Sequence, residues 1–140
     1  MPADAFYEWK AMAKGKQPYA IARKDGAPLA FAGLLEGWRC PDGETLHTFA
    51  IVTTSANADM AVLHDRMPVI LEPAGWPAWL GEAEAGPADL LRPAAVSVVR
   101  FWPVSRVVNS VVHNGPELLD RIKDLRGQPR HQTPAGENSA

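Results

Sequence analysis

Proline is the residue type that most constrains the fold of this chain. The sequence holds 13 prolines in 140 residues, nearly twice the usual share of about 5%. Proline lacks an amide hydrogen and fixes φ, so it interrupts helices and the interiors of sheets. The prolines are spread from Pro2 to Pro134, which leaves little room for a long helix. The sequence therefore predicts short strands, short helices and irregular loops.

Charge and composition exclude several classes of protein. The net charge is −2 and the pI about 6.1, whereas a domain that holds nucleic acid by bulk positive charge usually has a pI above about 9; a local basic cleft stays open. A single cysteine excludes a disulfide framework and suits a reducing cytoplasm. No apolar run approaches the roughly 18 residues of a membrane span, and the N-terminus does not resemble a signal peptide. We expect a cytoplasmic protein without membrane insertion.

Short apolar runs bounded by glycine, proline and charged residues predict the strands. The expected strands lie at 5–10, 19–23, 29–35, 49–54, 67–71 and 96–104. The second and third of these runs flank Asp25-Gly26. Because Asp-Gly is a favoured turn, they predict a β-hairpin.

The helical segments predicted by the sequence are short. They lie at 58–63, with Ser55 as its cap, at 76–80 and at 88–91, and the clearest pattern covers 116–125. In that last segment Pro116 sits in the first turn, and leucines and an isoleucine form one stripe. After Gly127 the chain is polar and is expected to be a disordered tail over 127–140. Strands dominate, so the fold class is α+β: one domain over 1–126, with a mainly antiparallel sheet and short flanking helices.

Glu8 is the first candidate for chemistry. On a strand, Phe6, Glu8 and Lys10 share one face, and Tyr7 and Trp9 share the other. A carboxylate held against aromatic rings is poorly hydrated, which suits it to proton transfer near neutral pH. The alternative is a strand glutamate whose head reaches water, as most glutamates do.

The segments 53–57 and 64–68 form a second candidate site. A strand end, a short helix and a return strand would bring Thr53 and His64 to one rim. An imidazole accepts or donates a proton at physiological pH, and Arg66 can grip a phosphate with two hydrogen bonds. The alternative is a loop histidine beside an arginine in a salt bridge.

Other residues carry weaker signals. Cys40 lies in a polar loop whose one basic neighbour is Arg39, which is typical of an unreactive thiol. The four histidines lack the spacing of metal ligands, and no glycine-rich phosphate loop is present. We therefore predict neither a metal site nor a cofactor.

Several segments resemble, in order and spacing, the motifs of one family. Residues 2–10 read PADAFYEWK and are similar to the P-A-D-G-F-Y-E-W motif of the SOS-response-associated peptidase (SRAP) family, the abasic-site-processing proteins. Residues 17–19, 29–34, 49–57, 64–71 and 103–109 follow in the family's order. The resemblance runs from Pro2 to about Leu125.

This resemblance implies a peptidase or lyase-type enzyme for abasic sites in single-stranded DNA, built on a barrel-like sheet. In the family, the amine and thiol of an N-terminal cysteine close a thiazolidine ring on the aldehyde of the opened sugar. The family glutamate matches Glu8 and moves protons at that amine. The family histidine matches His64 and helps to open the sugar and to assist strand cleavage or reversal. Thr53 and Arg66 match positions that contact DNA.

The beginning of the chain departs from the family pattern. Family members begin with M-C-G-R and carry a long segment before the first motif, whereas this chain begins at Met1-Pro2, within it. Cys40 cannot replace the missing cysteine because its nitrogen lies in a peptide bond. We therefore expect an acid–base pair without its nucleophile, in a truncated and impaired form of the enzyme.

Three hypotheses follow. In the first, the chain is a truncated product, part of a split gene or a miscalled gene start of a crosslinking enzyme. In the second, it is a non-catalytic DNA-binding or interaction module that pairs with a separate N-terminal half through an exposed apolar face. In the third, removal of Met1 frees the secondary amine of Pro2, which forms an iminium with the abasic aldehyde.

Overall fold

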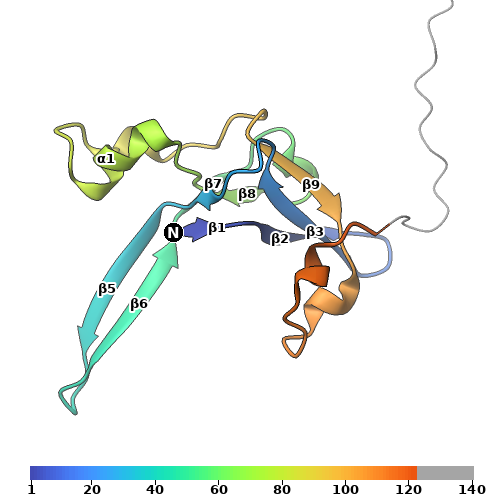
Figure 1. Ribbon diagram of the computed structural model, residues 1–140, viewed down its shortest axis with the longest axis horizontal. Coiled ribbons are helices and arrows are strands. Elements are labelled where there is room, and N and C mark those ends of the chain that lie inside the picture. Colours follow the sequence, from blue (N-terminus) through green and yellow to red (C-terminus); the bar gives the residue numbers. More distant parts are fainter. Residues whose placement is uncertain (123–140) are drawn as a thin grey trace, which may run out of the picture.

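Short antiparallel strands joined by loops dominate the computed structural model, which describes residues 1–122 (Figure 1). The strands are β1 (Pro2–Ala3), β2 (Phe6–Ala11), β3 (Lys16–Arg23), β4 (Leu29–Ala30), β5 (Gly33–Arg39), β6 (Thr45–Ile51), β7 (Thr53–Ser55), β8 (Arg66–Pro68) and β9 (Val99–Pro103). The helix α1 covers Trp76–Leu80, and 3₁₀ turns cover Met60–Val62, Pro73–Gly75, Pro87–Leu90, Arg106–Asn109 and Pro116–Leu119. All paired strands in this part of the chain are antiparallel. The predicted α+β class is confirmed.

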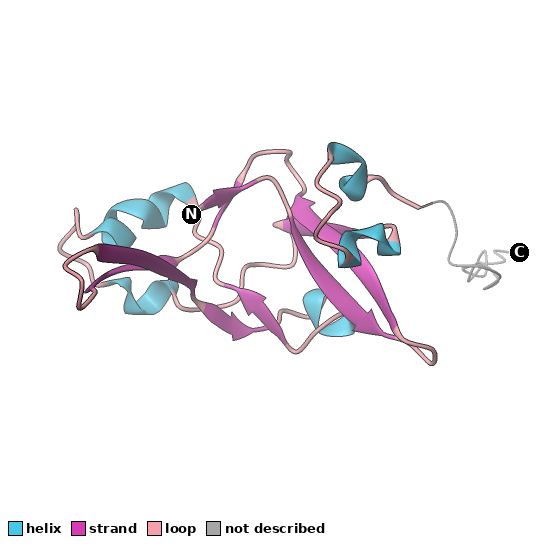
Figure 2. Ribbon diagram, turned by 90° about the horizontal axis from the view of Figure 1, so that it is seen from below, coloured by secondary structure: helices cyan, strands magenta, loops and turns pink. Residues whose placement is uncertain are grey.

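The central sheet has the strand order β2-β3-β9. Its register places Glu8 of β2 opposite Tyr19 of β3, and Ala20 of β3 opposite Trp102 of β9. Strands β1 and β4, β5 and β6, and β7 and β8 form two-stranded ladders around it. Within residues 1–122 these sheets do not close into a barrel (Figure 2).

The core lies where the central sheet meets the segment between β7 and β8. Its buried members come from both regions, and they are Ile21, Leu29, Phe31, Met60, Leu63, Met67, Ile70 and Val99. Within residues 1–122 the one buried polar residue is Gln17, which donates hydrogen bonds from Nε2 to the carbonyl oxygens of Val104 (2.8 Å) and Pro18 (3.0 Å). Among the described residues, each buried polar side-chain atom has a hydrogen-bond partner, so burial of these groups is compensated.

The predicted hairpin around Asp25-Gly26 is wrong. The turn itself forms, with Gly26 at φ 78°, but β3 pairs with β2 and β9, while β4 pairs with β1. Two local features oppose the hairpin. The Asp25 carboxylate accepts the amide hydrogen of Ala27, so the chain wraps around that side chain. Pro28, just before β4, has no amide hydrogen to give to a ladder.

The helix predicted over 116–125 shortens to the 3₁₀ turn Pro116–Leu119. Asp120 is extended, Arg121 forms a β-bridge with Val104, and the Ile122 N–H donates to the Pro103 carbonyl oxygen. The backbone after the turn therefore bonds to the end of β9 instead of continuing a helix. Residues 123–125 and the predicted tail over 127–140 lie outside the described residues.

The β5–β6 hairpin, here called the arm, projects from the rest of the molecule (Figure 1). It carries the turn at 40–44, in which the Cys40 N–H donates to the Glu44 carbonyl oxygen at 2.7 Å. No helix in residues 1–122 combines the length and hydropathy needed to cross a membrane.

An ion cluster ties the end of β3 to the segment before α1. The Arg23 guanidinium contacts Asp25 at 2.7 Å and Glu72 at 2.8 Å, and its side chain is 13% exposed. These carboxylates raise the pKa of Arg23. The pKa of the Asp25 carboxyl is lowered to about 2, mainly by its hydrogen bond to the Arg23 guanidinium and next by its hydrogen bond to the Ala27 N–H.

We expect this cluster to make stability fall in acid. The folded pKa of Asp25, about 2, lies below the unfolded value of about 3.9. Its contribution is therefore complete above about pH 4 and is lost as the pH falls through about 2. Urea unfolding of Asp25→Asn across this range should show a smaller acid-dependent loss than the wild type. The control is Glu84→Gln, on an exposed loop, and equal pH profiles for all three proteins would contradict the assignment.

Candidate functional site

The β7–β8 ladder presents two of the predicted site residues on one face. Ser55 pairs with Arg66, and Thr53 pairs with Pro68. Side chains alternate across a strand, so Thr53 and Arg66 share a face, and it is exposed. The opposite face carries Met67, which is 1% exposed. Burial of Met67 thus fixes Thr53 and Arg66 toward solvent.

The loop between β7 and β8 is held by Asn57. Its Oδ1 accepts the Met60 N–H at 2.9 Å, and its Nδ2 donates to the Ala94 carbonyl oxygen at 2.8 Å. The helix predicted over 58–63 is the shorter 3₁₀ turn Met60–Val62, whose N-cap is Asp59. The predicted cap, Ser55, lies in β7 instead, and the first amide of the turn bonds to the Asn57 side chain.

His64 follows directly from that turn. Its neighbour Leu63 is 7% exposed and belongs to the core, which fixes the backbone next to it. The His64 Nδ1 accepts the Arg66 N–H at 3.1 Å and lies 3.0 Å from the Asp65 Oδ1. In the neutral imidazole Nδ1 is therefore the acceptor, and Nε2 carries the hydrogen. After protonation Nδ1 can donate to Asp65 instead. The side chain is 40% exposed, so an outside group can exchange a proton with it.

Glu8 lies on the same face of β2 as Phe6, as predicted. The ring of Phe6 packs edge-on against that of Phe31, with 5.5 Å between the ring centroids. Its partner across the ladder is Tyr19, whose ring packs against Phe101 at 5.9 Å. The side chain is half-buried, and no hydrogen bond or ion pair within residues 1–122 engages its carboxylate.

The opposite face of β2 is also as predicted. The rings of Tyr7 and Trp9 lie 6.4 Å apart, and the Trp9 Nε1 donates to the Asn109 Oδ1 at 2.7 Å. Burial raises the pKa of Tyr7. These contacts hold β2 in place behind Glu8.

The candidate residues surround one core in two groups, with Glu8 on β2 and the other three around β7 and β8. Phe6 packs against the same buried cluster that contains Leu63, so Glu8 and His64 each extend from an element anchored there. The structure brings Thr53, His64 and Arg66 together around β7 and β8. No interaction within residues 1–122 joins Glu8 to them.

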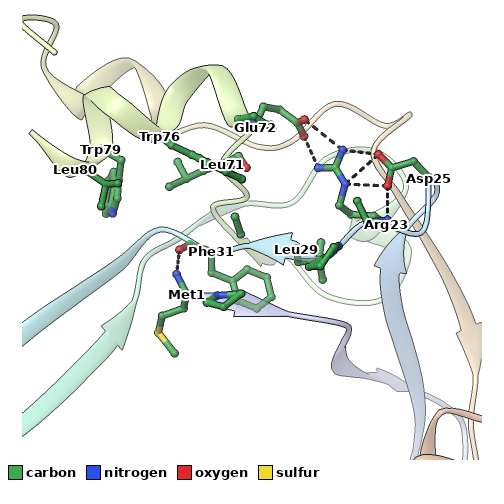
Figure 3. Close-up of a pocket in the computed structure, with 15 residues that line it drawn as sticks. Met1, Arg23, Asp25, Leu29, Phe31, Leu71, Glu72, Trp76, Trp79 and Leu80 are labelled. Atoms are coloured by element: carbon green, nitrogen blue, oxygen red, sulfur yellow. Dashed lines mark hydrogen bonds and ion pairs between the residues drawn. The ribbon is translucent and has the colours of Figure 1, made fainter. Parts of the chain in front are cut away.

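A pocket of about 600 Å³ lies beside α1 and was not predicted (Figure 3). Its apolar walls come from Met1, Leu29, Phe31, Leu71, Trp76, Trp79 and Leu80. Arg23 and Glu72 belong to its charged rim. The spacing of the two tryptophans, three residues apart on one helix, was the sequence signal for a shared face.

Neither the cysteine nor the possible metal ligands form a second site in residues 1–122. Cys40 is half-buried in the turn of the arm. In the described part of the chain, no group of three or more His, Cys, Asp or Glu side chains is placed to hold a metal ion.

Comparison with known proteins points to one family. Residues 1–111 match the family described as SOS response associated peptidase (SRAP). The chain is 42% identical over 124 residues to the abasic site processing protein YoqW of Bacillus subtilis, covering 86% of this chain and 55% of that protein. It is 37% identical over 144 residues to the abasic site processing protein HMCES of Gallus gallus, covering 86% of this chain and 42% of that one.

The fold is likewise similar to a solved structure. A crystal structure of a protein from Bacteroides thetaiotaomicron superposes with a TM-score of 0.78 at 27% identity, over 87% of this chain and 55% of that one. The chain thus spans about half the length of the relatives that it matches.

Loss of the Asn57 side chain should loosen the loop that carries His64. In Asn57→Ala the Ala94 carbonyl oxygen and the Met60 N–H lose partners in a partly buried site. We expect the free energy of unfolding to fall by about 1–3 kcal/mol, measured by urea denaturation. Asn114→Ala, in an exposed loop, is the matched control and should change little. Equal stability of both variants would show that Asn57 does not hold the loop.

Proposed function

This chain belongs to the SOS response associated peptidase family, and from that premise we propose that it acts on abasic sites in single-stranded DNA. The observation that carries the proposal is the exposed end of β8. There a proton-transfer group, His64, accepts a hydrogen bond from the backbone of Arg66. The Arg66 guanidinium has no ion-pair partner within residues 1–122 and is exposed. The relatives named abasic site processing proteins support abasic sites as the substrate.

In this proposal Thr53 and Arg66 hold the DNA strand. They lie on one exposed face of the β7–β8 ladder, so both can reach the same stretch of backbone. A free guanidinium matches the geometry of a phosphate, and a threonine hydroxyl can donate to a phosphate oxygen. The net charge of the chain is −2, but this does not prevent the contact, because Arg66 binds a phosphate locally and does not depend on the charge of the whole chain.

Glu8 and His64 act as the proton-transfer pair. The attacking amine adds to the aldehyde carbon of the opened sugar, loses water and becomes an iminium; the thiol then adds to that carbon and closes the thiazolidine. The amine nitrogen gives up a proton, the departing oxygen takes one up as water, and the thiol sulfur gives up its proton as the ring closes, each by exchange with an acid or base. We assign the proton at the amine to Glu8 and the proton of the sugar ring to His64. The amine and thiol belong to the N-terminal cysteine of the family pattern, a role that Cys40, inside a turn, cannot fill.

A second candidate function is a non-catalytic module that a separate N-terminal segment completes. The exposed apolar side chains of the arm favour it, since Leu35 is 76% and Phe49 63% exposed. Both candidates place the protein in the cytoplasm, where Cys40 stays reduced. In both, residues 1–126 form one domain, and the polar segment 127–140 follows it.

Arg66→Ala should weaken noncovalent binding of an abasic single-stranded oligonucleotide. The lost phosphate contact should also lower the slope of log affinity against log salt by roughly 0.7. Fluorescence anisotropy over a salt series measures both quantities. Arg39→Ala removes an exposed cation from the arm and is the matched control. If both variants bind alike, the β7–β8 face is not the DNA surface.

Covalent attachment is tested by a denaturing-gel shift with the same oligonucleotide. This chain is compared with one extended through any upstream reading frame that begins with methionine and cysteine. We expect the extended chain to shift, and His64→Ala and Glu8→Gln to slow the shift without weakening noncovalent binding. Borohydride added to this chain, beside Pro2→Ala, detects an iminium at Pro2. Unchanged rates in both catalytic variants would contradict their assignment.

A further inference from the structure

The segment that follows β9 takes no part in the chemistry proposed above, yet it is closely bonded to the central sheet. It enters the 3₁₀ turn Arg106–Asn109 through Ser105, whose Oγ accepts the Val107 N–H at 3.3 Å. Val104, at the start of the segment, is fully buried. The turn is thus capped at its beginning and anchored by a buried side chain, so its last residue, Asn109, has a defined position.

Val104 ties this segment to β3 through two hydrogen bonds. Its N–H donates to the Pro18 carbonyl oxygen at 3.1 Å. In such a pair of an antiparallel ladder the partner returns the bond, but proline has no amide hydrogen. The buried Gln17 amide replaces it, because its Nε2 donates to the Val104 carbonyl oxygen at 2.8 Å. The segment is therefore held against β3 at Pro18, which is the partner of Trp9 in the ladder between β2 and β3.

Strand β2 is held less completely than β3, and Trp9 supplies a further restraint. Within residues 1–122, β2 pairs along one edge only. Because Pro18 turns its carbonyl oxygen toward Val104, Trp9 and Pro18 form a pair without ladder hydrogen bonds. The Trp9 indole contributes a bond instead: its Nε1 donates to the Asn109 Oδ1 at 2.7 Å, across 100 positions of sequence. In the described part of the chain this is the one side-chain hydrogen bond made by a residue of β2.

Glu8 depends on this arrangement for the direction of its side chain. It precedes Trp9 and lies on the other face of β2, and no hydrogen bond or ion pair within residues 1–122 engages its carboxylate. Ladder bonds fix β2 beside β3, but an edge strand can still change its twist. Phe6 restrains that twist on the core face by packing against Phe31. On the other face, the restraint is the bond from Trp9 to Asn109. A rotation of β2 about its axis would move Trp9 and Glu8 in opposite directions.

We propose that Asn109 is a positioning residue for Glu8. By accepting the hydrogen of the Trp9 indole, its Oδ1 fixes the twist of β2 and so the place to which the Glu8 carboxylate points. Proton transfer requires the base to lie within hydrogen-bond reach of the proton, and a misplacement of about 1 Å can cost about a hundredfold in rate. The inference rests on the proton-transfer role proposed for Glu8, and it adds a residue that does not touch the reacting atoms.

Nuclear magnetic resonance of the 140-residue chain tests the coupling directly. The indole N–H signal of Trp9 and the side-chain carboxyl carbon signal of Glu8 are compared at neutral pH in the wild type, Asn109→Ala and Asn109→Asp. We expect Asn109→Ala to shift both signals, because the indole loses its acceptor and β2 loses a restraint. Asn109→Asp keeps an acceptor oxygen and should leave both signals closer to the wild type. The matched control, Asn114→Ala in an exposed loop, should shift neither.

Covalent attachment supplies the second test, with the extended chain and the abasic oligonucleotide of the gel-shift experiment. We expect Asn109→Ala to slow attachment about tenfold, and Asn109→Asp to restore most of the rate. Noncovalent binding should stay unchanged in fluorescence anisotropy, because the β7–β8 face is not altered. In the Glu8→Gln background, Asn109→Ala should cause no further slowing, since both changes then act on the same group. A merely structural residue would slow both backgrounds alike.

Three outcomes would overturn the proposal. They are a Glu8 signal that stays in place while the Trp9 signal shifts, equal effects of Asn109→Ala and Asn109→Asp, and further slowing by Asn109→Ala in the Glu8→Gln background. Circular dichroism shows whether each variant is folded. Trp9→Phe removes the donor of the same bond and should repeat the shift of the Glu8 signal, so the test does not depend on one variant. If no extended chain attaches to the oligonucleotide, the proposed function fails, while the two signals still decide whether Asn109 positions Glu8.

Discussion

The pairing of β3 on both of its edges is the constraint on which the rest of the structure depends. Among the strands of residues 1–122 it alone joins two other strands, β2 and β9. Its Ile21 enters the core, and the amide of Gln17 at its beginning holds Val104 at the end of β9. At its other end Arg23 reaches Glu72, just before α1. One strand thus positions β2 with Glu8, closes the core and anchors the pocket.

The positions of most strands and of α1 could be predicted because the signals are local. Runs of apolar and β-branched residues end at glycine or proline, and the five residues of α1 begin after a glycine and carry a proline in the first turn. Partners could not be predicted in the same way. The Asp25-Gly26 turn favours a hairpin locally, but β2 pairs with β3 along its whole length, and β1 pairs with β4. The stripe over 116–125 fails similarly, because the Trp102 Nε1 and the end of β9 bond to its backbone.

The candidate site shows the same division. Glu8, Thr53, His64 and Arg66 were identified by residue type and spacing, and the alternation of a strand correctly placed the aromatic neighbours of Glu8. The support of the site was not predictable. It depends on Asn57 reaching Ala94, 37 positions along the chain, and on burial of Met67 behind the exposed face of β8. Such contacts are properties of the assembled fold, which a motif does not contain.

The arm and the candidate site are joined through one residue, Val52. Val52 separates β6 from β7; its N–H donates to the Ala32 carbonyl oxygen, and its own carbonyl oxygen accepts the Val69 N–H, both at 2.9 Å. The arm therefore continues directly into the strand that carries Thr53, and Val69 continues from the strand that carries Arg66. A change in the position of the arm would therefore act, through this three-way junction, on the orientation of the β7–β8 face. Ordering of the arm and alignment of the candidate DNA contacts are then coupled, because the backbone of Val52 takes part in both.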